Sequence, residues 1–507
     1  MTTSALNYCT SRLGAFDETG RFPTTSHDMA TTMAAYAKVS EKTDLALFFH
    51  GGLLSRADGV NLAKRLQSRF PEPAATQAAG RNVYPYSFVW ESGLLDELLR
   101  NLPEIVSDIV FQRILSIVAA TARTILNAQQ PPAVPTMSTI LPTTAAVAGN
   151  FAPGVAPTAA QIDEVQRAVE NDPLIRTAKA RVAATRSSLL SPEILAAIAA
   201  EEQQTVRLGI LALKAGVVLS QMIHRFSFGR DHGFHETLIE EILRAYYLVN
   251  AGFATWTEAK AGAAAAFSPD PASYVGTNMV RELVKMFDAK KRPRVALVAH
   301  GAGALYVCPF LAAMDSELLG KSYGPDIRFD VIVLAPAVRV DVWSAMSERY
   351  GHMIGDFRMF SMLDAQERND ALLRRAGEPA ASPANEILGQ IYRRSLLYFT
   401  SGVLEDEDGD TPLLGMVRFF SGAGAFGPGR NAMIDALRES FAAAPQRRVL
   451  SSPPPAVQPA PAQPPIGLRC TSRRHEDFIT DAATLESICY VLRSHAYDTN
   501  HHEAGNG

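Results

Sequence analysis

Three short apolar runs constrain the fold of this chain more than any other feature. They occupy residues 45–49 (LALFF), 295–299 (VALVA) and 331–334 (VIVL), and Gly or Pro follows each run within a few residues. Runs of this length and composition are typical of strands that are buried on both faces of a parallel sheet. Helical patterns separate several of the strand candidates. This alternation predicts an α/β fold with a doubly wound, mostly parallel sheet and a site at the carboxyl ends of its strands.

The 507 residues are enough for one large domain with insertions. Weaker strand candidates lie at residues 83–90, 357–362 and 467–470. We expect residues 1–90 and 294–495 to form the α/β core, and residues 91–293 to form a large helical insertion or cap. Within the insertion, residues 129–157 are rich in Ala, Pro and Thr and almost uncharged, which predicts a flexible linker. Residues 451–466 form a proline-rich insertion, and residues 496–507 are predicted to be a disordered tail.

The composition excludes several classes of function. Lys plus Arg is 48 and Asp plus Glu is 52, so there is no basic excess to neutralise a nucleic acid. The four cysteines are scattered without a C-x-x-C pair, and we expect neither a metal site nor a cofactor. The most apolar helix candidate, residues 208–223, contains Lys214 and Gln221 and is short for a membrane span. With no signal peptide pattern at the N-terminus, these features predict a cytoplasmic protein without an integral membrane span.

The strongest single signal is the turn after the second apolar run, which reads HGAG at residues 300–303. An apolar helix is expected to begin near Ala304. From Ala299 to Gly303 the segment fits the G-x-S-x-G nucleophile elbow, which needs small residues two positions before and after the nucleophile. Ala299 and Gly303 meet that need. The nucleophile position itself is Gly301, which has no side chain to attack a substrate.

A dinucleotide-binding turn is the alternative interpretation of the same segment, because G-x-G also follows a strand in that motif. The third glycine of that motif would stand at Tyr306. Its acidic residue would end the next strand, which instead runs into Ala335 and Pro336. We therefore favour the elbow.

A second glycine turn, His50-Gly51-Gly52, directly follows the strand at residues 45–49. It is similar to the HGG-type loop whose backbone N–H groups bind an oxyanion in lipases and esterases. Glycine lets the backbone approach a substrate closely. Its place at the end of a buried strand, upstream of the elbow, favours this interpretation over an ordinary turn.

An acid and a base should follow the elbow in chain order. Asp364 lies at the end of the strand expected at residues 357–362, where a catalytic acid belongs. Four other acidic residues are alternatives for this role: Glu367, Asp370, Glu405 and Asp406. Each of the five could instead be a solvated acid at the start of a helix. The best-placed base is His475, between the expected strand at residues 467–470 and a helix at residues 482–492, although an exposed loop histidine is the alternative.

On these residues the chain resembles the α/β-hydrolase superfamily, of the serine esterase or lipase kind, over residues 40–90, 294–370 and 467–492. The resemblance implies oxyanion donors at Gly51, Gly52 and Ala302, with Asp364 as acid and His475 as base. It also implies a small-molecule ester or amide as substrate. The departure is Gly301, which removes hydrolysis through an acyl-enzyme.

A polar cluster in the insertion is a candidate lid over this site. It consists of Arg230, Asp231 and His232, ahead of an amphipathic helix. A capped helix start with a surface histidine is the alternative interpretation.

Three functional hypotheses follow. The first is a serine-hydrolase scaffold of the carboxylic ester hydrolase type that has lost its nucleophile, by drift or by design. The second is a non-catalytic binding or scaffolding protein that uses the pocket and the insertion. In the third, His475 activates water directly, without a covalent intermediate.

Overall fold

The computed structural model describes most of the chain, in twelve segments: residues 7–17, 23–52, 54–70, 82–128, 155–185, 188–201, 208–370, 372, 392–405, 409–422, 426–452 and 464–493. Most of the predicted linker (residues 129–154), most of the proline-rich insertion (residues 453–463) and the tail lie outside the described residues.

A seven-stranded sheet in the order β1-β3-β2-β4-β5-β6-β7 forms the centre of the core, and every strand pairing in it is parallel. The predicted α/β class with a parallel sheet is therefore confirmed. The strands are β1 (Tyr8–Arg12), β2 (Thr43–Phe49), β3 (Asn82–Glu91), β4 (Val295–His300), β5 (Phe329–Leu334), β6 (Ile354–Ser361) and β7 (Arg448–Leu450).

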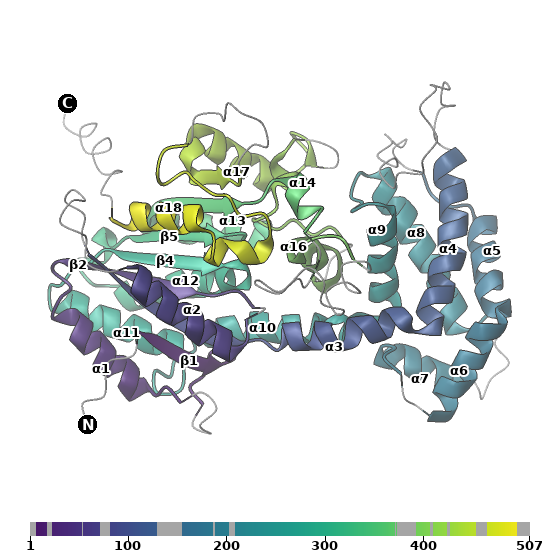
Figure 1. Cartoon of the computed structure of the whole chain (residues 1–507), viewed down its shortest axis with the longest axis horizontal. Helices are drawn as coiled ribbons and strands as arrows, with labels where there is room; N and C mark the ends of the chain where they lie inside the picture. The colour runs from purple at the N-terminus through teal and green to yellow at the C-terminus, as the bar shows by residue number, and fades with distance from the viewer. Residues whose placement is uncertain are drawn as a thin grey trace.

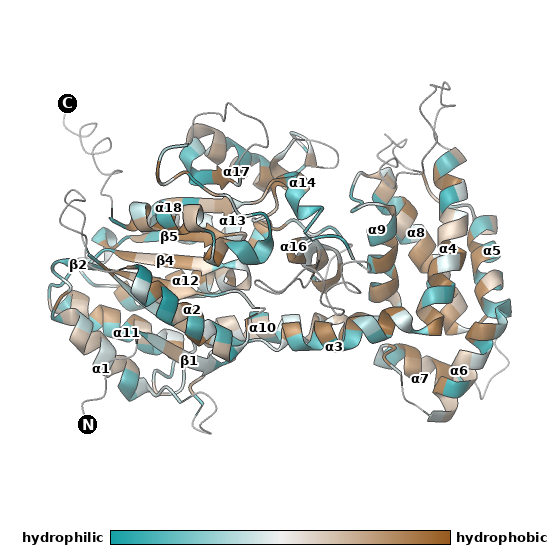
Figure 2. Cartoon of the chain, viewed as in Figure 1, coloured by the Kyte–Doolittle hydropathy of each residue, from teal (hydrophilic) through white to brown (hydrophobic). Residues whose placement is uncertain are grey.

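The central strands β2, β4 and β5 are buried at every residue, and Figure 2 shows β4 and β5 as hydrophobic. The continuous apolar run within each of them is explained by helices on both faces of the sheet. Phe49 of β2 is in register with Ala299 of β4. Because the two strands are parallel and adjacent, the turn after β2 and the turn after β4 leave the sheet side by side.

Helices cover both faces of the sheet (Figure 1). One face packs against α2 (Arg56–Arg69) and α18 (Ala482–Arg493). The other face packs against α1 (Ser26–Ala37), which contacts β3 through Tyr36 and Tyr84, and against α12 (Val307–Leu318), which contacts β5 through Phe310 and Phe329. The remaining core helices are α11 (Val275–Asp288), α13 (Val340–Tyr350), α14 (Asp364–Glu367), α16 (Leu396–Phe399) and α17 (Ala432–Ala443). The prediction placed α11 in the insertion (residues 91–293), but it packs on α1 and α12 of the core.

The insertion is helical throughout its described part, and its helices gather beside the sheet domain in Figure 1. The long α3 leads from β3 towards a group of helices in which α4 packs on α5, α6, α8 and α9. The helices are α3 (Leu94–Ser107), α4 (Ile109–Ala128), α5 (Ala159–Asn171), α6 (Pro173–Thr185), α7 (Pro192–Glu201), α8 (Ile210–Ser227), α9 (Phe234–Ile242) and α10 (Phe253–Ala265).

One helix of the described chain, α4, is long and apolar enough to cross a membrane by length and composition. This is not the segment at residues 208–223 that the sequence singles out. Nearly half of the apolar window of α4 is buried against its neighbours in the bundle. Core helices of soluble proteins pass the same test, so α4 is weak evidence for a membrane span.

Three strand assignments differ from the sequence prediction. Residues 467–470 form a turn and irregular backbone instead of a strand, because Gly467 has φ +94° and breaks the extended conformation. The edge strands β1 and β7 were not predicted. Both are short, and their sequences lack the continuous apolar run of a central strand.

A buried ionic cluster joins the insertion to the core. Arg225 of α8 pairs with Glu240 at 2.7 Å and with Glu241 at 2.9 Å, both on α9. His232 lies between the insertion and the core, with one ring nitrogen 2.8 Å from Glu240 and the other 2.8 Å from Asp410.

The core side of this cluster is held by Arg418, which pairs with Asp410 at 3.0 Å, and by the hydroxyl of Tyr392, which donates to Glu240. The side chains of Arg225, His232, Glu240 and Asp410 are fully buried. Because desolvated charges are costly without their partners, the insertion and the core hold each other in one arrangement.

Replacing Arg225 with methionine should destabilise the protein by about 3–5 kcal/mol, because Glu240 and Glu241 would remain buried without their cation. Urea denaturation followed by circular dichroism measures the change. The control is the same substitution at Arg281, whose side chain is 45% exposed and lies 3.8 Å from Glu317. That change should cost about 0.5 kcal/mol or less. Equal losses in both variants would contradict a special role for the buried cluster.

Candidate active site

The elbow segment forms a tight turn at the carboxyl end of β4. Gly301 has φ +51°, in the left-handed region that favours glycine. A Cβ atom at Gly303 would overlap the carbonyl oxygen of Phe49, so no side chain fits there. A 3-10 helix (Gly301–Tyr306) begins at once and continues into α12, whereas the sequence predicts a helix start near Ala304. The turn is tight because two backbones meet at Gly303.

The HGG turn after β2 faces the elbow. The distance between the two turns can be judged from where a side chain on a glycine would begin. A Cβ atom added to Gly52 would lie 3.0 Å from the Cβ of Ala302, and one added to Gly301 would lie 3.8 Å from the Cα of Gly51. The first N–H groups of a helix have no acceptor within that helix. These distances bring the predicted oxyanion residues Gly51 and Gly52 close to Ala302 and to position 301, although the two turns are far apart in the sequence.

His475 faces the same position from far down the chain. A Cβ built on Gly301 would lie 2.8 Å from Nε2 of His475 and 3.4 Å from its Cε1. His475 begins a 3-10 helix (His475–Ile479) and is buried. Burial lowers the pKa of His475 well below its usual value, and the neighbouring His300 lowers it further. The imidazole is therefore neutral at pH 7, which is the form that accepts a proton.

The other two histidines of the site support its backbone. Nε2 of His50 accepts from the N–H of Trp90 at 3.0 Å, and Nδ1 of His50 lies 2.8 Å from the carbonyl oxygen of Gly51, to which it donates. Nε2 of His300 lies 2.8 Å from the carbonyl oxygen of His475. Burial lowers the pKa of His50 and that of His300 to about 4 each. Both rings are thus neutral hydrogen-bonding groups. No motif in the sequence indicates the contact of His50 with Trp90, because the two residues lie 40 positions apart.

The predicted acid, Asp364, binds partners other than the imidazole. It accepts a hydrogen bond from the hydroxyl of Tyr398 at 2.6 Å and pairs with Arg368 at 2.9 Å. No hydrogen bond joins Asp364 to His475 in the described structure. The role of Asp364 as a catalytic acid stays a prediction without a contact to support it.

The competing acids are also engaged or neutral. Burial raises the pKa of Glu367 well above its usual value, which favours the neutral carboxyl. Glu405 accepts from Trp256 and Lys260, and Asp406 lies outside the described residues. Asp370 is the one of these acids with a hydrogen bond to His475, and it accepts from the backbone N–H at 2.8 Å, not from the ring.

The candidate lid residues are fixed at the contact between insertion and core. Arg230 donates to the carbonyl oxygen of Gly409 at 2.7 Å, and the carbonyl oxygen of Asp231 accepts from Arg418 at 3.2 Å. His232 is fully buried in the ionic cluster, so it is not a surface histidine. Their role as a lid stays a prediction, and the contacts described here are structural ones.

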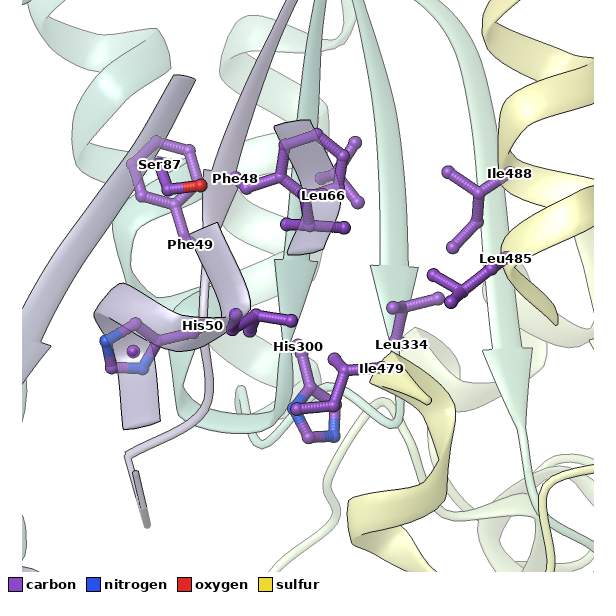
Figure 3. A pocket seen from close by; sticks show the side chains of 13 residues that line it. Phe48, Phe49, His50, Leu66, Ser87, His300, Leu334, Ile479, Leu485 and Ile488 are labelled. Atoms are coloured by element: carbon purple, nitrogen blue, oxygen red, sulfur yellow. The ribbon is translucent and has the colours of Figure 1, made fainter. Parts of the chain in front are cut away.

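A narrow apolar cavity lies on the α2 and α18 side of the sheet, with His50 and His300 at the carboxyl end of the strands (Figure 3). Phe48, Leu334 and Ile488 are among the side chains that line it. Its volume is about 20 Å³, which is room for about one water molecule. In this conformation the cavity is too small for an acyl chain.

No side chain near the elbow replaces the missing nucleophile among the described residues. The hydroxyl of Ser92 donates to the carbonyl oxygen of Gly52. Cys308 lies in α12, and burial raises the pKa of its thiol to about 12, which keeps it protonated. The described residues also contain no group of three or more His, Cys, Asp or Glu side chains that could hold a metal ion.

Comparison with known proteins does not assign a family. No family model, curated protein or solved structure matches this chain. What it does must therefore be argued from the geometry of its own residues.

The low pKa of His300 predicts a pH dependence of stability. The unfolded chain takes up a proton at position 300 as the pH falls through about 6.5, whereas the folded protein does so only near pH 4. Stability should therefore fall between these values, by up to about 1.4 kcal/mol per pH unit for this group. The His300→Gln variant keeps an N–H donor but has no group that titrates at this position. Its stability should therefore fall less steeply with decreasing pH than that of the unmodified protein, by up to about 1.4 kcal/mol per pH unit.

Denaturation midpoints measured from pH 7 to pH 4 provide the test. His352→Gln is the matched control, because the side chain of His352 is 58% exposed. Identical slopes for the His300→Gln variant and the unmodified protein would show that His300 does not stay neutral in the folded state.

Proposed function

We propose that this chain is a serine-hydrolase scaffold of the carboxylic ester hydrolase type, in which Gly301 stands at the nucleophile position. One observation carries the proposal: Nε2 of His475 lies 2.8 Å from the point where a side chain at position 301 would begin. A general base must lie within hydrogen-bond reach of the hydroxyl that it activates. A Cβ at this distance is closer than van der Waals contact, so the ring of His475 must move back slightly to admit a serine side chain, which leaves Nε2 within reach of its hydroxyl although 174 positions separate the two residues in the chain.

The proposed roles follow the arrangement of the two turns. A serine at position 301 would attack the carbonyl carbon of an ester or amide, and His475 would take its proton. Backbone N–H groups of Gly51, Gly52 and Ala302 would stabilise the oxyanion, because donors fixed around the developing charge lower the barrier. As the sequence stands, Gly301 has no atom that can form the acyl-enzyme, and the chain is inactive by that route.

A binding role without turnover is the second candidate function. The observation that favours it is that the hydroxyl of Ser92, which donates to the carbonyl oxygen of Gly52, and the buried thiol of Cys308 are unsuited to attack. A chain that keeps the HGG turn, the elbow and a buried imidazole without a nucleophile can still hold an ester-like ligand. The small volume of the apolar cavity indicates that such a ligand would contact the turns and not the interior behind them.

Restoring the nucleophile tests the first candidate directly. Gly301→Ser should hydrolyse p-nitrophenyl acetate at least about 100-fold faster than the unmodified chain, because nucleophile, base and oxyanion donors act as a unit. Gly301→Ser should also form a covalent adduct with a fluorophosphonate at residue 301, measured by mass spectrometry. A side chain at φ +51° costs about 1–2 kcal/mol, so a modest loss of stability is expected.

Gly301→Ala is the control, since it adds a Cβ at the same place without a hydroxyl. It should stay inactive and unlabelled, as should Gly301→Ser combined with His475→Ala. A folded Gly301→Ser variant that neither hydrolyses the ester nor reacts with the fluorophosphonate would refute the hydrolase scaffold and leave the binding role.

A further inference from the structure

Buried side chains bind both the backbone N–H and the backbone carbonyl oxygen of His475. Its N–H donates to Oδ2 of Asp370 at 2.8 Å, and its carbonyl oxygen accepts from Nε2 of His300 at 2.8 Å. Asp370 is 7% exposed and His300 is 2% exposed. Hydrogen bonds in such surroundings are shielded from competing water, so they restrain the backbone at residue 475.

The two residues that bind this backbone, His300 and Asp370, come from different parts of the fold. His300 is the last residue of β4, directly before the elbow, and Asp370 follows α14 beyond the end of β6. His475 is thereby tied to the same backbone that presents position 301. A shift of the elbow would carry the imidazole with it.

The ring of His475 is held differently from its backbone. Its Nδ1 is buried and has no hydrogen-bond partner among the described residues, whereas the edge with Nε2 and Cε1 faces Gly301. The ring lies against that of His300, with centroids 4.9 Å apart and planes inclined by 33°. Packing and the backbone, and not a carboxylate on Nδ1, therefore fix the direction in which Nε2 points.

We infer that Asp370 and His300 are positioning residues that hold the base of this site through its backbone, in place of an acid bound to its ring. The inference rests on the proposed function, because it assigns a task to the groups around the same imidazole. It also gives Asp370 a role that differs from that of the acid in a Ser-His-Asp site, where the carboxylate binds the ring N–H and selects its tautomer.

The chemistry of the two roles separates them. A backbone N–H needs an acceptor oxygen, and the side-chain oxygen of asparagine serves as well as that of aspartate. A carboxylate on the ring also stabilises the imidazolium that forms during the reaction, and asparagine does not. Under the inference, Asp370→Asn should rescue most of what Asp370→Ala removes.

The kinetic test uses the Gly301→Ser protein and p-nitrophenyl acetate. Asp370→Asn in that background should keep kcat within about threefold, whereas Asp370→Ala should lower kcat by about tenfold or more with little change in KM. The pH profile of the Asp370→Asn variant should match that of its parent. A loss of about 10⁴-fold in the Asp370→Asn variant would instead identify Asp370 as a ring-bound acid and overturn the inference.

A second measurement is independent of activity and uses the chain with Gly301 in place. Nitrogen NMR of ¹⁵N-histidine-labelled protein reports the tautomer of His475, assigned with a His475→Gln variant. The signals should be the same in the unmodified protein and in the Asp370→Asn variant. A strongly downfield Nδ1–H signal that disappears in the Asp370→Asn variant would contradict the inference, even if Asp370→Ala fails to fold.

The two measurements distinguish the failure of the inference from that of the proposed function. If Gly301→Ser is inert while the ring signals persist in the Asp370→Asn variant, the backbone restraint stands and the hydrolase proposal fails. If Gly301→Ser is active and Asp370→Asn destroys that activity, the hydrolase proposal stands and the restraint is wrong.

Discussion

The site depends on the parallel pairing of β2 with β4. With Phe49 in register with Ala299, both strands end at the same level and their glycine turns leave the sheet together. The absence of a side chain at Gly303 lets the elbow pack on the carbonyl oxygen of Phe49. Everything else at the site is arranged on this contact between backbones, including the approach of His475 to position 301.

Much of the core could be predicted from the sequence, because each central strand contains a continuous apolar run that Gly or Pro follows within a few residues. The runs at residues 45–49, 295–299 and 331–334 all lie within observed strands. The edge strands β1 and β7 could not be predicted this way, since an edge strand needs no continuous apolar run. The segment at residues 467–470 failed because Gly467 takes a left-handed conformation that a run of four residues does not reveal.

The site was partly predictable for a different reason. Gly301, the HGG turn and His475 could be named because local motifs mark the ends of strands and the starts of helices. Whether those residues meet depends on packing across the whole chain, which no local pattern encodes. The partners of the acids were beyond reach for the same reason: the bonds of Asp364 to Tyr398 and of Asp370 to the backbone of His475 join segments that are distant in sequence.

The buried charges between the helical insertion and the core determine how the molecule can move. Swinging the insertion outward as a hinged body would leave the pairs Arg225–Glu240 and Arg418–Asp410 intact, but it would break the buried contacts of His232 with Asp410 and of Tyr392 with Glu240. Rigid-body opening along this seam would therefore cost buried hydrogen bonds that join the two parts. Local rearrangement of side chains at the rim of the sheet would open the two glycine turns to a ligand and leave these contacts between the insertion and the core intact.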